Sequence, residues 1–366
     1  MRTAKLTVLA AILFLSGCNT TSKVMAPPQS TVRVYSGTAS VGDFLTISID
    51  SNAQKIIYKN YTNGETGTVP YTINSDGTYA ISDPNGNLLA GYEVPGFVIM
   101  IEAANAGPNK DTAALITAIE TAPATINTFA GQNFNYLQFR TAAGGTEVGT
   151  ITIDGQGNVQ HDGYWPFGVF SQNLFNGGGF TASSVTEDPS GNFFTIHESQ
   201  GADYAFGTPS GFFVVDTGNG TILSLPKAAT KAFDATRAGT YTALYYQKEN
   251  AQTGQGNVET GTASEGKAMV TISNSGLMTI TDNQGHILAT GTLTAVADTP
   301  YLYDGTANTL SDPLHGMFTF RMSTGGVQQD VFASFESNAV IFSSFQTALP
   351  IGGYAAYTYY YGVGIK

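Results

Sequence analysis

Two histidine–carboxylate dyads are the first residues in this sequence that could do chemistry. His161-Asp162 and His197-Glu198 lie on strand-like segments in the middle of the chain, while His286 and His315 lie in its C-terminal part. If the two segments were neighbours in a sheet, their imidazoles and carboxylates could bind a metal ion or act as acid and base. Consecutive residues of a strand point to opposite faces, so each dyad can place only one side chain in such a site. Polar surface residues explain both dyads more simply.

The motifs of common enzyme classes are absent from the sequence. It has no Gly-x-Ser-x-Gly nucleophile motif, no His-Glu-x-x-His zinc motif and no glycine-rich phosphate loop with a lysine. Glycosidase chemistry needs two carboxylates that face each other across a cleft. Among the 27 acidic residues, however, spacing selects no pair. We therefore predict no catalytic residue, no cofactor and no metal, and a glycan-acting hydrolase remains the alternative.

An aromatic and glycine-rich segment between Gly163 and Phe180 is the strongest binding candidate. It contains the only tryptophan of the chain. The candidate ligand-binding side chains are Tyr164, Trp165, Phe167, Phe170 and Phe175. Exposed rings of this kind stack on sugars or cover an apolar patch of a partner protein. The alternative is that the rings fill an interface between domains, where the glycines allow a tight path.

The elements that must position these side chains are mainly β-strands. Only 11% of the residues are charged and 43 are glycine, a composition that favours strands and tight turns. Alternating strands such as Leu45–Ile49 and Thr150–Ile153 precede turns in which an Asp or Asn stands three residues before a Gly. These turns are Asn74–Gly77, Asp83–Gly86, Asp154–Gly157, Asp188–Gly191 and Asp282–Gly285. The first side chain caps the turn and the glycine closes the hairpin. Calcium loops are the alternative, but none of the turns has EF-hand spacing.

Two segments are predicted to be helical. Leu115 and Ile119 share one face of a helix over Asp111–Ala122, which Pro123 would end, and Lys227–Ala238 is a second, weaker candidate. The predicted fold class is therefore all-β. It consists of tandem small antiparallel β barrels or sandwiches, in two to three related units, with one or two short connecting helices.

An internal repeat divides the chain. The strand and turn that begin at Ile47 are echoed at Ile151 and Val270. A hydrophobic strand follows later in each unit, and these strands begin at Gly96, Gly211 and Ala339. Successive units start roughly 105–120 residues apart, which fits a small all-β domain. We predict three β units, at residues 32–128, 129–233 and 234–366, and chance similarity among short strands is the alternative.

The first 18 residues indicate where the protein resides. Arg2 and Lys5 precede an apolar run, Leu6–Leu15, that is too short to cross a bilayer as a helix. The sequence Leu-Ser-Gly-Cys at Leu15–Cys18 resembles the lipobox of bacterial lipoproteins. The resemblance implies that residues 1–18 form a lipoprotein signal, that cleavage occurs before Cys18, and that Cys18 is lipidated. The alternative is an ordinary secretory signal, in which Cys18 has no role in anchoring.

The residues after Cys18 predict how the protein is held and what it can bind. Several acyl chains would anchor it stably, whereas a single chain binds only marginally. Residues 19–31 are rich in Thr, Ser and Pro and are predicted to be a disordered tether. Residue 19 is Asn. In Gram-negative lipoproteins an Asp at this position resembles an inner-membrane retention signal, so Asn19 favours the outer membrane.

Without Arg2 and Lys5 the chain has 13 basic and 27 acidic residues, a formal charge of −14. Phosphate binding needs clustered basic residues, so no nucleic-acid partner is predicted.

The lipobox, the tether and the glycine-aromatic β units together resemble lipidated β-barrel surface receptors such as transferrin-binding-protein-like lipoproteins. Gly316–Phe320 has the Gly-x-Phe pattern of that class. No ligand and no residue is carried over from this resemblance. We predict a non-enzymatic, lipid-anchored envelope protein with a binding or interaction role and a protein or glycan partner. A purely structural surface lipoprotein is a further alternative.

Overall fold

A computed structural model describes most of the chain after residue 31. The described residues are 32–39, 42–83, 86, 88–106, 112–121, 124–139, 147–166, 183–189, 193–198, 201–217, 220–227, 232–253, 256–258, 263–296, 316–324, 327–336, 338–345 and 357–366. No helix within these ranges has the length and apolar character needed to cross a membrane. Two short 3-10 turns, η1 (Ile126–Thr128) and η2 (Ala235–Arg237), precede the second and third sheets.

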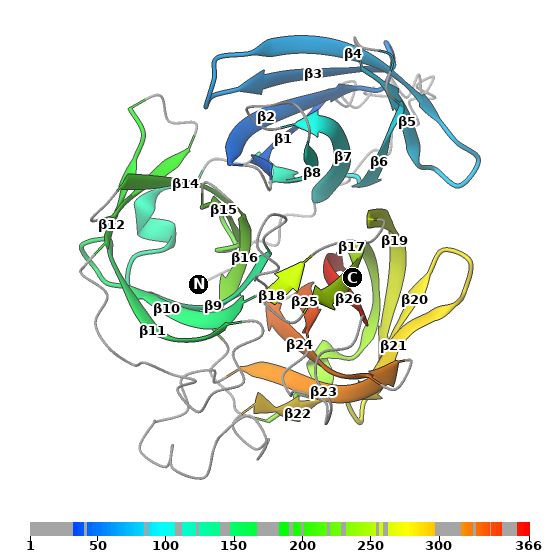
Figure 1. Ribbon diagram of the computed structural model, residues 1–366. Helices are drawn as coiled ribbons and strands as arrows, with labels where there is room; N and C mark the ends of the chain where they lie inside the picture. Colours follow the sequence, from blue (N-terminus) through cyan, green and yellow to red (C-terminus); the bar gives the residue numbers. More distant parts are fainter. Residues whose placement is uncertain are drawn as a thin grey trace, which may run out of the picture. The chain divides into compact units, whose positions relative to one another are not determined.

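The first sheet is a closed antiparallel barrel, which we call barrel 1 (Figure 1). Its strands pair in sequence order, and β1 also pairs with β8, which closes the barrel. The strands are β1 (Val32–Ala39), β2 (Asp43–Asp50), β3 (Lys55–Asn60), β4 (Thr66–Ile73), β5 (Tyr79–Ser82), β6 (Leu88–Val94), β7 (Val98–Ala106) and β8 (Thr112–Glu120).

Barrel 2 repeats this plan, because β9 pairs with both β10 and β16. Its strands are β9 (Gln132–Phe139), β10 (Glu147–Ile153), β11 (Asn158–Pro166), β12 (Ser183–Glu187), β13 (Phe194–Glu198), β14 (Gly201–Gly207), β15 (Phe213–Asp216) and β16 (Thr221–Pro226). The prediction of tandem small antiparallel β barrels is thus confirmed.

The third sheet, sheet 3, is barrel-like and follows the order β21-β20-β19-β17-β26-β25-β24-β23-β22, with β18 paired to β17. The two ends of this path approach each other, since a Cβ added to Gly291 of β21 would lie 2.2 Å from the Phe320 ring of β23. The strands are β17 (Gly239–Thr253), β18 (Gly256–Val258), β19 (Ala263–Ile272), β20 (Leu277–Asp282), β21 (Ile287–Thr292), β22 (Thr294–Ala295), β23 (Met317–Thr324), β24 (Val327–Glu336), β25 (Ala339–Phe345) and β26 (Tyr357–Ile365).

The helix predicted over Asp111–Ala122 is wrong. Most of this segment forms β8, which pairs with β7 and β1. Ala118 packs with the interior cluster of barrel 1, whereas Leu115 and Ile119 pack in a cluster outside it. A strand buried on both faces has no alternation of polar and apolar residues, so periodicity cannot distinguish it from a buried helix.

The second helical candidate, Lys227–Ala238, contains only the turn η2 in its described part. The Asp234 side chain accepts a hydrogen bond of 2.9 Å from the Thr236 backbone N–H and caps this turn. The sequence pattern that suggested a helix there therefore specifies a capped 3-10 turn of three residues, directly before the first strand of sheet 3.

Four of the predicted hairpin turns are confirmed, at Asn74–Gly77, Asp83–Gly86, Asp154–Gly157 and Asp282–Gly285. In each, the glycine N–H donates to the carbonyl of the first residue at 2.9–3.1 Å, and the glycine has a positive φ. In the third turn, hydrogen bonds from the side chain and backbone of Asn158 hold the pKa of the Asp154 carboxyl below its ordinary value. This carboxylate therefore stabilises the turn through its hydrogen bonds. The two central residues of Asp83–Gly86, and part of Asp188–Gly191, lie outside the described residues.

The segments that echo one another in sequence occupy equivalent places in the sheets. The strand–turn echoes lie on β2, β10 and β19, each of which pairs with the first strand of its sheet. The hydrophobic strands that follow later are β7, β15 and β25, each the penultimate strand. The segments that resemble one another in sequence therefore have the same position in the strand order of their sheets, and so do the hairpins that contain them.

In each sheet, a tyrosine ring lies over a glycine of the neighbouring strand. The direct cross-strand pairs are Tyr58 with Gly67, Tyr136 with Gly149, and Tyr245 with Gly266. A Cβ added to any of these glycines would lie 2.5–2.6 Å from the ring. The glycines thus make room for the rings, a pairing that also fixes strand register.

Candidate functional site

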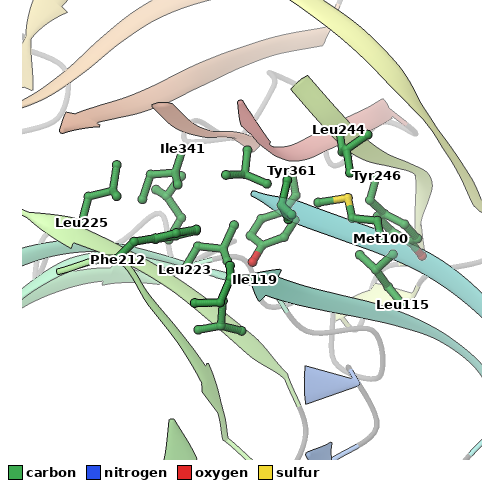
Figure 2. Packing of buried hydrophobic residues seen from close by; sticks show 14 of the residues in the cluster. Met100, Leu115, Ile119, Phe212, Leu223, Leu225, Leu244, Tyr246, Ile341 and Tyr361 are labelled. Carbon is green, nitrogen blue, oxygen red and sulfur yellow. The ribbon is translucent and has the colours of Figure 1, made fainter. Parts of the chain in front are cut away.

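The last two strands of each sheet turn their outer faces toward one hydrophobic cluster, the junction cluster, which Figure 2 shows from close by. Its members from these strands are Val98, Met100, Leu115 and Ile119 of barrel 1, Val214, Leu223 and Leu225 of barrel 2, and Ile341, Tyr361 and Val363 of sheet 3. All of them are at most 1% exposed. Because each sheet also has its own interior core, these strands are buried on both faces.

Directed contacts add to the junction cluster. The hydroxyls of Thr38 and Thr221 are hydrogen-bonded at 2.7 Å between barrel 1 and barrel 2. The Phe44 ring stacks on Tyr204 with centroids 4.1 Å apart. Lys267 of sheet 3 donates from Nζ to the Gly77 carbonyl at 3.1 Å. Residues 31–366 accordingly form one compact unit.

Three hairpin turns meet at one pocket beside the junction cluster. They are the β6–β7, β14–β15 and β24–β25 turns, each of which leads into the penultimate strand of its sheet. The pocket, which we call the junction pocket, has a volume of about 350 Å³. It is lined by Gly96, Phe97 and Glu120 of barrel 1, by Thr208, Pro209, Ser210, Phe212 and Leu225 of barrel 2, and by Glu336, Asn338, Ala339 and Ile365 of sheet 3.

Local turn chemistry holds the first two hairpins. In the first, the Phe97 N–H donates to the Val94 carbonyl at 3.0 Å, and Gly96 has a φ of 77°. In the second, the Gly211 N–H donates to the Thr208 carbonyl at 2.9 Å, and the Thr208 hydroxyl accepts from the Phe212 N–H at 3.2 Å. Positive φ favours glycine, so both turns are specified by sequence.

The third hairpin is held by the C-terminal strand. The Lys366 N–H donates to the Asn338 carbonyl at 2.9 Å, so the end of β26 supports the β24–β25 turn. The neighbouring residue, Ile365, lines the pocket.

Aromatic and aliphatic side chains give the pocket an apolar wall. The Phe97 and Phe212 rings, from different barrels, stack with centroids 5.7 Å apart and an interplanar angle of 27°. Phe212 is buried and Leu225 is fully buried. Pockets of this size that combine apolar walls with a few polar groups are typical ligand sites.

Two carboxylates give the junction pocket a negative character. Glu120 and Glu336 line it, and its lining among the described residues includes no Lys or Arg. Glu336 has a positive neighbour outside the lining, Arg237. The pKa of the Arg237 guanidinium is lowered, because the effect of burial is larger than that of the Glu336 charge, which raises this pKa. Glu120 ends β8, where its backbone N–H donates to the Phe97 carbonyl at 2.8 Å, and it is exposed. Of the two carboxylates, Glu120 is the more exposed and therefore the more accessible to a cation from solvent.

The aromatic segment proposed from sequence is only partly described. Tyr164 and Trp165 belong to β11, where their backbones pair with Gly149 and Val148 of β10. Their side chains, and the residues Phe167, Phe170 and Phe175, lie outside the described part of the structure. Cys18 also lies outside it. Their assigned roles stay predictions.

The condition for a histidine site is not met. His161 is on β11 and His197 is on β13, and β12 pairs with both strands and separates them. His197 instead contacts the Thr186 hydroxyl, with 2.9 Å between Nε2 and Oγ1, and His286 contacts the Asp282 carboxylate at 2.9 Å inside a hairpin turn. Within the described ranges, no group of three or more His, Cys, Asp or Glu side chains could hold a metal ion. His315 lies outside these ranges.

Sequence reasoning did not find the junction pocket. Its signal was nonetheless present in the three hydrophobic strands that begin at Gly96, Gly211 and Ala339. The turn before each of these strands supplies pocket residues. The sequence does not show that three turns far apart in the chain pack around one pocket.

Comparisons with known proteins add little to this geometry. No known family model matches the sequence, and no curated protein matches it. Among solved structures, the chain is similar to the vaccine antigen Transferrin Binding Protein B (TbpB) from Haemophilus parasuis Hp5, with 11% identity, a TM-score of 0.31, and coverage of 92% of this chain and 76% of that one. The chain is also similar to the isotype 1 TbpB from serogroup B Neisseria meningitidis, with 12% identity, a TM-score of 0.26, and coverage of 88% of this chain and 65% of that one. TM-scores this low do not establish a shared fold.

Proposed function

We propose that the chain is a non-enzymatic, lipid-anchored envelope protein that binds a partner through the junction pocket. The observation that carries this proposal is that equivalent hairpins from all three sheets build one pocket. Its volume of about 350 Å³ is that of a small ligand or of one or two side chains.

The apolar wall of the lining supports a binding role. Among the described residues, the lining has no histidine, cysteine or lysine, and its two carboxylates, Glu120 and Glu336, are the groups on which the alternative, a glycan-acting hydrolase, would depend. The Ser210 hydroxyl is hydrogen-bonded to the Thr208 hydroxyl at 2.8 Å. Hydroxyl and amide groups at the rim can instead orient a bound molecule.

We further propose that Cys18 is lipidated, that residues 19–31 tether the folded part, and that the protein resides at the outer membrane. The lipobox-like Leu15–Cys18 and the identity of Asn19 support this placement. The aromatic segment from Tyr164 to Phe175 is proposed as a second contact surface for a protein or glycan partner, because it holds the only tryptophan among closely spaced rings and glycines.

Replacing Cys18 by Ser is expected to abolish membrane attachment in a Gram-negative host. Without the thiol, no diacylglycerol can be added, and the chain loses the anchor that two or more acyl chains provide. Wild-type protein should incorporate labelled palmitate and fractionate with the outer membrane, whereas Cys18→Ser should incorporate none and leave the membrane fraction.

The matched control is Asn19→Asp, which should still be labelled but should move to the inner-membrane fraction. Equal palmitate incorporation by wild type and Cys18→Ser would contradict the anchoring proposal. Outer-membrane fractionation of Asn19→Asp would contradict the role assigned to Asn19.

A further inference from the structure

We propose that the junction pocket takes a hydrophobic side chain that stands beside a Lys or Arg in a segment of a partner protein. This inference rests on the proposed binding function of the same pocket. It assigns the pocket an apolar contact, a charge contact and a source for the ligand, and each has its own basis in the structure.

The apolar contact follows from the wall of the pocket. Phe97 and Phe212 are stacked across the boundary between barrel 1 and barrel 2, and Leu225 and Ile365 complete the apolar lining. Burying a large apolar side chain against such a wall contributes roughly 1.5–3 kcal/mol relative to leaving it in water. The volume of about 350 Å³ has room for one Phe or Leu side chain of a partner.

The charge contact follows from Glu120. Its carboxylate lies near the β6–β7 turn, since a Cβ added to Gly96 would be 3.9 Å from Oε2. The long-range field acts in the same direction, because the chain has a formal charge of −12 and attracts basic segments.

A peptide source is favoured over a free amine by the polar groups of the lining. Thr208, Ser210 and Asn338 come from two of the three turns and offer hydroxyl and amide groups. Such groups can pair with the backbone N–H and C=O of an extended peptide. A free amine supplies hydrogen-bond donors only, whereas a peptide backbone supplies both donors and acceptors to these groups.

The test compares three probes that differ in one side chain. N-acetyl dipeptide amides with the sequences Phe-Lys, Phe-Gln and Phe-Glu are titrated into the full chain in nonionic detergent. Binding is followed by NMR of the methyl groups of Leu225 and Ile365, two residues that line the pocket. We expect the Phe-Lys probe to bind roughly three- to fivefold more tightly than Phe-Gln, the size expected for one partly exposed charge pair. The Phe-Glu probe should bind most weakly.

Glu120→Gln should remove the preference for Phe-Lys over Phe-Gln while leaving the affinity for Phe-Gln unchanged. The control is Glu65→Gln, which removes an exposed carboxylate outside the pocket and should keep the preference. The methyl spectrum of each variant reports whether it is folded.

The outcomes separate this inference from the function on which it rests. Equal affinity for all three dipeptides would overturn the charge contact and leave binding at the pocket intact. Tighter binding of phenethylammonium than of any dipeptide would assign the pocket to a free amine and overturn the peptide source. An absence of methyl shifts with every probe would overturn both the inference and the proposed function.

Discussion

Replacement of Glu93 by Gln is expected to lower the free energy of unfolding by about 3 kcal/mol, the low end of the effect of breaking a buried ion pair. Glu93 is 3% exposed inside barrel 1. The Arg33 guanidinium donates to its two oxygens from Nε at 2.7 Å and from Nη2 at 2.8 Å. The hydroxyls of Tyr35 and Tyr79 also donate to this carboxylate.

The size of the effect follows from the number of donors. An amide at position 93 would direct its own N–H groups at one or more of these donors and leave the Arg33 charge without its counter-ion. The Arg33 side chain is 25% exposed, so water compensates part of the loss, and this places the effect at the low end.

Urea unfolding of Glu93→Gln at neutral pH measures this effect. The double variant Arg33→Met with Glu93→Leu should recover part of the stability, because it removes both charges together but leaves the Tyr35 and Tyr79 hydroxyls without Glu93 as acceptor. Glu65→Gln, at an exposed carboxylate, should change stability by no more than about 0.5 kcal/mol. A loss below about 1 kcal/mol in Glu93→Gln would show that the pair behaves like a surface ion pair.

Alkaline pH is expected to destabilise the protein steeply above about pH 10. Burial, and then the hydrogen bonds to Glu93, raise the pKa of Tyr35 and of Tyr79 above the ordinary tyrosine value. A raised pKa in the folded state means that stability is full below the unfolded value of about 10 and is lost as pH rises from there. Each tyrosine contributes a slope of about 1.4 kcal/mol per pH unit, or about 2.8 kcal/mol per pH unit for both.

Urea unfolding at a series of pH values from about 9 to 12 gives this slope. Tyr35→Phe should be less stable than wild type at neutral pH because it loses a hydrogen bond to Glu93. Above pH 10 its stability should fall less steeply, by about 1.4 kcal/mol per pH unit. The difference between the two proteins cancels the titration of lysines, and identical slopes would contradict the assignment to Tyr35.

Local features of this fold were predictable because they depend on neighbours in sequence. The turn at Asp154–Gly157 could be recognised from its residues alone, since the capping carboxylate and the glycine act within four positions. The equivalent places of Ile47, Ile151 and Val270 could be recognised from an echo of a few residues. The boundaries proposed for the three β units stay a prediction, since the contacts after residue 30 form one compact unit.

Features that depend on distant contacts were not predictable. Strand β8 resembled a helix because Leu115 packs outside barrel 1 while Ala118 packs inside it. The choice between barrel and sandwich depends on the pairing of β1 with β8, which are far apart in sequence. The junction pocket needs Phe97, Ser210 and Asn338 to meet, and no local pattern specifies that meeting.

The central claim is that hairpins from different sheets form one pocket, and cross-linking tests it most directly. Ser210→Cys and Asn338→Cys are introduced together in a Cys18→Ser chain, which has no other cysteine. The protein is treated with a short bis-maleimide and its intact mass is measured. The account predicts one reagent bridging both thiols, whereas a control with Ser210→Cys and Glu65→Cys should carry two reagents. Two reagents on the Ser210→Cys, Asn338→Cys protein would contradict the claim that these hairpins share a pocket.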